Sequence, residues 1–200
     1  MRKEISAIET VVKINQKDHA QGHICPKVED WLKFGPAGLL RIANEKLALA
    51  SDNRKVFYKS VCTTLYGACK FISRYGVLAS EMSNNQEDES LKTNLNDIAD
   101  VCIKLSSNPP GTFREALQSV WFLFVILHME SNASSFSPGR IDQYLYSFYK
   151  NDLESGIMDN DKTLELLDAL FIKFNQIVYM RNAHSAKYFA GFPIGFNVTI

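Results

Sequence analysis

Small polar residues gather where one apolar segment ends and an aromatic-rich one begins. A nearly uncharged apolar stretch, 113–129, runs into Glu-Ser-Asn-Ala-Ser-Ser at 130–135. The hydroxyls of Ser134 and Ser135 can hydrogen-bond a substrate hydroxyl or carboxylate, although they do not titrate near neutral pH. Binding sites are often built where a loop leaves a packed scaffold. Taken alone, the residue types favour loop and helix-cap polarity over a binding role.

A second group of residues that could do chemistry lies near the N-terminus. Helical spacing of apolar residues begins the chain and gives way after Asn15 to a polar loop that contains His19 and His23. A histidine can donate or accept a proton near neutral pH, so it could protonate a leaving hydroxyl group. Composition alone favours solvent-exposed loop histidines at both positions.

Composition sets the limits for these sites. The chain has 200 residues, 46% of them hydrophobic, which suffices for the core of one ordinary domain. Its 22 basic and 22 acidic residues balance, so no charge pattern predicts nucleic-acid or membrane-surface binding. The N-terminus lacks the apolar core of a signal peptide, and the longest apolar run, 120–127, is too short to span a bilayer. We therefore expect a cytoplasmic protein.

The cysteines predict buried thiols rather than a metal site. No two of them have CxxC spacing, which argues against zinc or iron–sulfur binding. Cys62 and Cys69 lie seven positions apart on one face of an expected helix, where two buried thiols are the favoured interpretation. The four are Cys25, Cys62, Cys69 and Cys102.

Helical periodicity dominates the rest of the chain. After a loop that reaches residue 32, apolar spacing predicts helices over 34–50, 54–82, 91–105, 113–129 and 161–181, and alternation predicts a strand over 192–200. Thr112 and Glu115 have capping-box spacing, and Arg140 and Asp142 are spaced for a structural ion pair or a cap. The aromatic residues 144–149 are expected in the core. Inward-facing residues are also expected to include Val56, Phe57, Leu78, Leu91, Leu164 and Phe171.

The segment ESNASSFSPGRIDQYLYSFYKND, 130–152, resembles the glycyl radical enzymes, the pyruvate formate-lyase-like superfamily. The likeness is greatest to the dehydratase and decarboxylase branch. Three other stretches resemble landmarks of the same family: GHICPKVEDWLKFGPAGL at 22–39, NPPGTFREALQSVWF at 108–122 and FAGFPIGFNVTI at 189–200. The resemblance covers nearly the whole chain.

The resemblance implies a substrate pocket to which four residues contribute. In the diol dehydratase branch, a loop like the one around His23 supplies a histidine to the substrate hydroxyls, and an asparagine at the position of Asn15 reaches the same pocket. Ser134 and Ser135 occupy positions that line the active site. The chain departs from the usual pattern at Lys27, where an acidic residue is common, and at Ser134, where a histidine often stands. No catalytic or metal-binding residue is predicted.

The resemblance also implies a fold and a cofactor. We expect a predominantly α-helical fragment with one or two strands, 1–200, which forms part of the family's ten-stranded α/β barrel and is truncated at both ends relative to the family. The family uses a glycyl radical, installed by a radical SAM activating enzyme, and a thiyl radical on a cysteine. The chain contains no Cys-x-Glu motif and no glycyl-loop motif.

Two hypotheses about function follow. The first is a fragment of a glycyl radical lyase for a small polar substrate, resembling diol or hydroxy-acid dehydratases and inactive alone, with the activase and a complementing chain or homodimer as partners. The alternative is a non-catalytic helical interaction module derived from such an enzyme. In either case we expect exposed apolar faces on helices 113–129 and 161–181, and therefore a tendency to self-associate.

Overall fold

Helices make up almost all of the computed structural model, which describes residues 24–131, 136–177 and 198–199. Within these ranges, β pairing consists of two isolated parallel bridges, Ile24 with Phe136 and Gly139 with Val198. The predominantly helical prediction is confirmed; the described ranges form no barrel, and most of the strand expected at 192–200 lies outside them. The helices are α2 (Val28–Ala48), α3 (Asp52–Asn84), α4 (Glu89–Ser107), α5 (Phe113–Ser131), α6 (Ile141–Glu154) and α7 (Asn160–Asn175).

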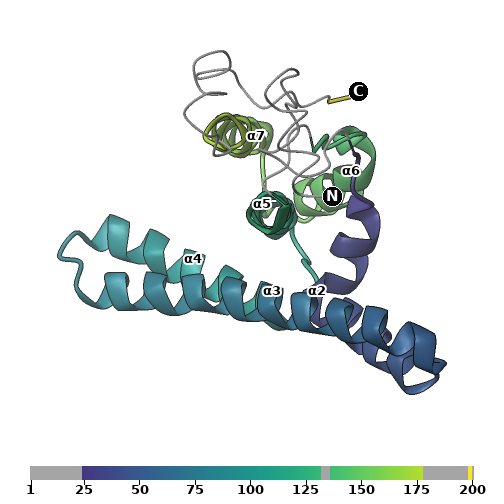
Figure 1. The fold of residues 1–200 in the computed structure, drawn as a ribbon. Coiled ribbons are helices and arrows are strands. Elements are labelled where there is room, and N and C mark those ends of the chain that lie inside the picture. The colour runs from purple at the N-terminus through teal and green to yellow at the C-terminus, as the bar shows by residue number, and fades with distance from the viewer. Residues whose placement is uncertain (1–23, 132–135, 178–197, 200) are drawn as a thin grey trace, which may run out of the picture.

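The described helices form two layers, one built on the α3–α4 hairpin and one around α5. α3 and α4 lie side by side as an antiparallel pair, with α2 packed along α3 (Figure 1). The Asp88 carboxylate caps α4 by accepting the Ser90 N–H at 2.8 Å and the Leu91 N–H at 3.0 Å. A Cβ atom on Gly76 of α3 would lie 2.8 Å from the Ile103 side chain of α4, so the glycine permits a close approach of the two helices.

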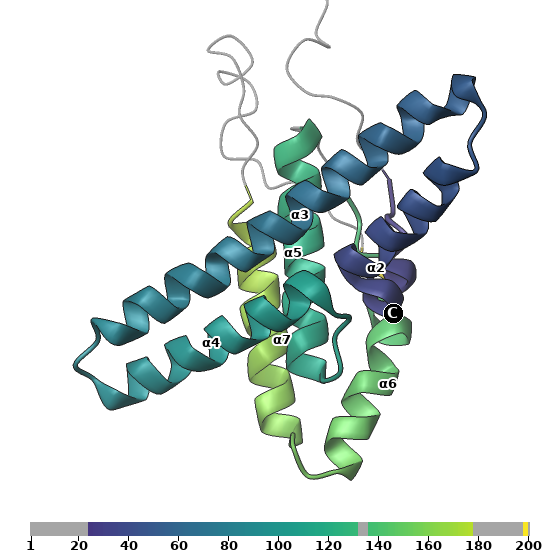
Figure 2. The same cartoon turned by 90° about the horizontal axis from the view of Figure 1, so that it is seen from below.

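α5 is the centre of the second layer. It contacts α2, α4, α6 and α7, and Figure 2 shows the α3–α4 hairpin crossing it. Ala116, Val120 and Phe124 of α5 are each 0% exposed. The predicted capping box is confirmed at its start: the Glu115 N–H donates to Thr112 Oγ1 at 3.3 Å, and the Thr112 N–H donates to Glu115 Oε2 at 3.2 Å. No described helix is both long and apolar enough to cross a bilayer.

The loop predicted up to residue 32 is wrong over its last part, because α2 begins at Val28. Gly35 and Pro36, at the expected start of helix 34–50, form a kink between two helical segments. Gly35 has φ 62° and ψ 170°, values that no α-helix contains. A glycine can adopt this backbone without a Cβ clash, and Pro36 then restarts the helix with its fixed φ.

Several residues expected to face inward are exposed, which is a second correction. The reason is that helical spacing identifies an apolar face but does not show whether another element covers it. The expected exposure of α5 is confirmed only near its end, where Met129 is 57% exposed, because most of its other apolar residues are buried; α7 does expose apolar residues. The exposed fractions are 73% for Val56, 64% for Phe57, 49% for Leu78, 51% for Leu91, 60% for Leu164 and 43% for Phe171.

Candidate functional site

The four residues predicted to bind substrate, Asn15, His23, Ser134 and Ser135, lie outside the described residues. The direct chain neighbours of two of them are described. Ile24, which follows His23, pairs in parallel with Phe136, which follows Ser135. The Ser137 N–H donates to the Ile24 carbonyl oxygen at 2.9 Å. The structure therefore joins the backbones of the two segments that carry predicted site residues.

A third segment meets the same place. Gly139 pairs with Val198, and the Thr199 N–H donates to the Gly139 carbonyl oxygen at 3.1 Å. Gly139 has φ 69°, and a Cβ atom there would lie 2.6 Å from Cys25 Sγ. Both the backbone conformation and the close approach of Cys25 require a residue without a side chain. We call residues 24–25, 136–139 and 198–199 the junction.

The turn after the junction is held by an ion pair. Arg140 Nε lies 2.9 Å from Asp142 Oδ1 and Arg140 Nη2 lies 2.8 Å from Asp142 Oδ2, which confirms the expected pairing. The hydrogen bond from Arg140, with a second from Gln143, holds the pKa of Asp142 well below its usual range. Because both carboxylate oxygens of Asp142 accept hydrogen bonds from neighbouring residues, the ion pair has a structural role.

The aromatic segment behaves only partly as expected. Tyr144 is buried and donates its hydroxyl to the Pro138 carbonyl oxygen at 3.1 Å, so it ties α6 to the junction. Burial raises the pKa of Tyr144, which keeps the phenol protonated as a donor. Tyr146 is 59% exposed, so the prediction of core packing is wrong for this residue.

His128 is a residue near the junction that the sequence did not single out. Its ring is buried at the end of α5 and packs edge-on against Phe136, with ring centroids 4.9 Å apart. Nδ1 lies 2.6 Å from the Phe124 carbonyl oxygen; since a carbonyl only accepts, Nδ1 carries the hydrogen. Burial lowers the pKa of His128, which favours the neutral imidazole. No local sequence signal marks this contact.

Trp31 makes another contact that the sequence did not reveal, with Ser119. Its indole Nε1–H lies 2.9 Å from Ser119 Oγ and 3.0 Å from the Ser119 carbonyl oxygen. Both residues are buried. The bond links α2 to α5, which are far apart in the sequence, and only the fold brings the partners together.

Burial affects the chemistry of two of the described thiols, Cys69 and Cys102. Burial raises the pKa of Cys102 to about 11 and also raises the pKa of Cys69, so both remain protonated near neutral pH. Cys62 and Cys69 are only partly buried, whereas Cys102 is fully buried. Among the described residues, no cluster of histidine, cysteine and carboxylate side chains could hold a metal ion.

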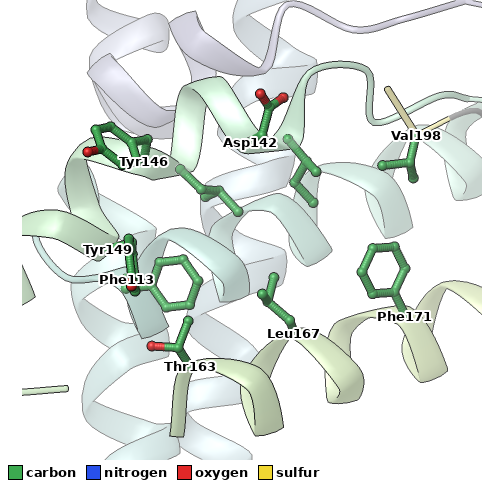
Figure 3. Close-up of a pocket in the computed structure, with 10 residues that line it drawn as sticks. Phe113, Asp142, Tyr146, Tyr149, Thr163, Leu167, Phe171 and Val198 are labelled. Carbon is green, nitrogen blue, oxygen red and sulfur yellow. The ribbon is translucent and has the colours of Figure 1, made fainter. Parts of the chain in front are cut away.

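An apolar cavity lies next to the junction, and Val198 of the junction is one of the residues that line it. Its volume is about 320 Å³, between α6, α7 and the start of α5 (Figure 3). Leu167 and Phe171 reach into it from α7, and Val198 closes the end next to Gly139. A polar substrate would find few partners on such walls, so the cavity suits side-chain packing.

Comparison with known proteins decides the family. The family model described as pyruvate formate lyase-like matches residues 1–200. The chain belongs to the pyruvate formate lyase-like family. The chain is 36% identical to the probable dehydratase YbiW of Escherichia coli strain K12 over 145 residues. The match covers 72% of this chain and 18% of YbiW.

Solved structures agree with the family assignment. The glycerol-bound, B12-independent glycerol dehydratase from Clostridium butyricum has a TM-score of 0.82 and 33% identity, over 90% of this chain and 23% of that one. A glycyl radical enzyme from Archaeoglobus fulgidus has a TM-score of 0.81 and 29% identity, over 90% of this chain and 24% of that one. The chain thus spans less than a quarter of the length of these relatives.

Proposed function

We propose that this chain supplies one wall of the substrate pocket of a glycyl radical lyase that removes a hydroxyl or similar group from a small polar substrate. The observation that carries the proposal is the Ile24–Phe136 bridge, which ties the segment after His23 to the segment after Ser135. Membership of the family and the likeness to a glycerol dehydratase support it. A diol or hydroxy acid is the substrate class proposed.

The four predicted residues have complementary roles in this proposal. Asn15, Ser134 and Ser135 hydrogen-bond the substrate hydroxyls and fix their orientation. His23 binds a hydroxyl and donates a proton to it as the C–O bond breaks, so that water can leave. With serine in place of the histidine common at position 134, this wall of the pocket carries one titratable group fewer.

The radical chemistry must come from elsewhere in the enzyme. A glycyl radical, installed by a radical SAM activating enzyme, supplies hydrogen-atom abstraction in this proposal. None of the four cysteines precedes an x-Glu pair in the sequence, and the described thiols of Cys69 and Cys102 have raised pKa values. We therefore assign no radical step to this chain, which alone would be inactive and would act with a complementing segment, chain or homodimer.

The test is anaerobic purification of this protein from its host, followed by mass spectrometry and electron paramagnetic resonance. We expect peptides with Cys-x-Glu and a glycyl loop in the same polypeptide or in a stable complex, an organic radical signal after activation, and dehydration of glycerol or 1,2-propanediol. Absence of both the peptides and the radical would overturn the proposal.

Substitutions then test the residue roles in the active material. His23→Gln should lower kcat/KM by about 100-fold or more, the usual contribution of a positioned general acid. Ser135→Ala should lower it about tenfold, the value of one hydrogen bond to substrate. Ser60→Ala is the matched control, because Ser60 is an exposed serine of α3 that donates to the Val56 carbonyl oxygen at 3.0 Å. An unchanged kcat/KM for His23→Gln would remove its assigned role.

The second candidate function is a helical interaction module that binds a full-length enzyme of the family. It is favoured by the exposed apolar side chains of α3, which include Val56, Phe57, Val77, Leu78 and Met82. This candidate predicts that the purified chain captures an intact family enzyme without changing its substrate preference. Peptides from a complementing radical-bearing segment of the same polypeptide would instead support the lyase.

A further inference from the structure

We propose that Trp31 is a positioning residue that aligns the segment beginning at Ile24, which follows His23, with the segment beginning at Phe136, which follows Ser135. It acts through the hydrogen bond from its indole to Ser119 of α5. This inference rests on the proposed function and deepens it, because it names the contact that aligns the two halves of the proposed substrate wall.

The segment from Ile24 to Phe34, here called the arm, is joined to the rest of α2 by a kink. Gly35 at the kink has φ 62° and ψ 170°, so the helical hydrogen-bond ladder does not carry the direction of one segment into the next. A Cβ atom on Gly35 would lie 3.1 Å from the Asn108 carbonyl oxygen and 3.2 Å from Pro109 N. The kink therefore packs against the backbone of Asn108 and Pro109, which precedes α5. Contacts other than the helix backbone must fix the direction of the arm.

Burial alone does not fix that direction. Val28 is 1% exposed, Trp31 5% and Leu32 3%, so one side of the arm is well packed. Apolar contacts are non-directional, and a short helix can slide or rotate over them. The indole of Trp31 adds a directional contact, with Ser119 Oγ at 2.9 Å and the Ser119 carbonyl oxygen at 3.0 Å.

Because Ser119 belongs to α5, the hydrogen bond from Trp31 fixes the arm to that helix. The helix α5 ends at Ser131, five residues before Phe136. The bond therefore fixes the arm to the helix that leads in the sequence to Phe136 and Ser137. At the far end of the arm, the Ser137 N–H bonds to the Ile24 carbonyl oxygen at 2.9 Å, while Ile24 itself is 43% exposed. A single bridge at an exposed residue is weak, so its alignment depends on the anchor at Trp31.

Amide hydrogen exchange of the labelled 200-residue chain tests the inference by NMR. Trp31→Phe keeps most of the aromatic packing and removes the N–H donor. We expect the Ser137 amide to exchange about tenfold faster in this variant, relative to the amide of Val120 in the core of α5. Trp121→Phe is the matched control, since Trp121 is the other tryptophan and packs against Phe174 at 6.3 Å instead of the arm. Trp121→Phe should not make the Ser137 amide exchange faster relative to the Val120 amide.

Ser119→Ala keeps the inference testable if Trp31→Phe does not fold. This change removes one acceptor and leaves the Ser119 carbonyl oxygen, so we expect about threefold faster exchange at Ser137 and no selective change at Val120. Equal acceleration of both amides would show a general loss of stability and overturn the positioning role, as would an unchanged Ser137 rate. The exchange measurement needs neither substrate nor radical. A negative result would therefore overturn the role of Trp31 and leave the proposed lyase function to the kcat/KM measurements.

Discussion

Two phenylalanines, one in each layer of the molecule, have opposite surroundings. Phe124 in α5 is 0% exposed and packs against Phe174 with ring centroids 5.2 Å apart. Phe57 in α3 is 64% exposed. Both stand on apolar stripes with helical spacing, yet α5 packs against α2, α4, α6 and α7, whereas α3 packs mainly against α2 and α4. The difference shows that burial in this chain is decided by tertiary partners and not by the stripe itself.

The largest expected effect separates these two phenylalanines. Phe124→Ala removes a ring from the core and should lower the free energy of unfolding by about 3–5 kcal/mol. Phe57→Ala should change it by less than about 0.5 kcal/mol, because an exposed ring loses little on truncation. Urea unfolding followed by circular dichroism measures both. Similar losses for the two variants would show that the α3 ring is covered in solution, for example by self-association.

Two glycines of α3 sharpen the comparison within the hairpin. Gly67→Ala meets nothing within 4 Å and should stabilise the chain by about 0.5–1 kcal/mol through helix propensity. Gly76→Ala would place Cβ 2.8 Å from the Ile103 side chain and 3.1 Å from the Ala99 carbonyl oxygen. We expect this variant to be destabilised by about 1 kcal/mol, since overpacking outweighs propensity. Thermal unfolding of the pair is the measurement, and equal stabilisation by both would argue against the close approach of α4.

A further comparison concerns the ion pair that joins the two layers. Lys104 Nζ of α4 lies 2.7 Å from Glu115 Oε2 of α5, and the Gly111 N–H donates to the same oxygen at 2.6 Å. Burial alone would raise the pKa of Glu115, but the hydrogen bonds from Lys104 and Gly111 outweigh it and hold the pKa below its usual value. Glu115→Gln should therefore cost about 1 kcal/mol at neutral pH.

The sign of the pH dependence follows from the lowered pKa of Glu115. A carboxylate with a depressed folded pKa stabilises the fold above its unfolded pKa, about 4.3, and loses that contribution as the pH falls through the folded pKa. The difference between wild type and Glu115→Gln should therefore shrink below about pH 4. Urea unfolding at pH 7, 5 and 3.5 measures it. A difference that is constant with pH would mean that the charge of Glu115 contributes nothing.

Local features of the fold could be predicted from the sequence. The capping box at Thr112 and Glu115 and the ion pair of Arg140 with Asp142 depend on residues three or two positions apart, and both are confirmed. The kink at Gly35 could not be predicted, because a Gly-Pro pair is equally typical of a helix start. The exposed stripe of α3 was misjudged because no sequence signal marks a missing partner.

The candidate site depends on contacts between distant segments. The resemblance selected His23 and Ser135, and the structure adds the Ile24–Phe136 pairing next to them. The roles of Trp31 and His128 are set by partners on α5 and at the junction, which neither periodicity nor composition identifies. Asn15, His23, Ser134 and Ser135 remain predictions, since they lie outside the described residues.

The most direct test of the central claim, that the two segments carrying the predicted site residues are paired, is a nuclear Overhauser measurement on the labelled chain in solution. The parallel pairing predicts a cross-peak between the Ile24 Hα and the Ser137 amide hydrogen, because the Ser137 N–H donates to the Ile24 carbonyl oxygen at 2.9 Å. Observation of this cross-peak would place the two segments side by side. Its absence, with a rapidly exchanging Ser137 amide, would contradict the account.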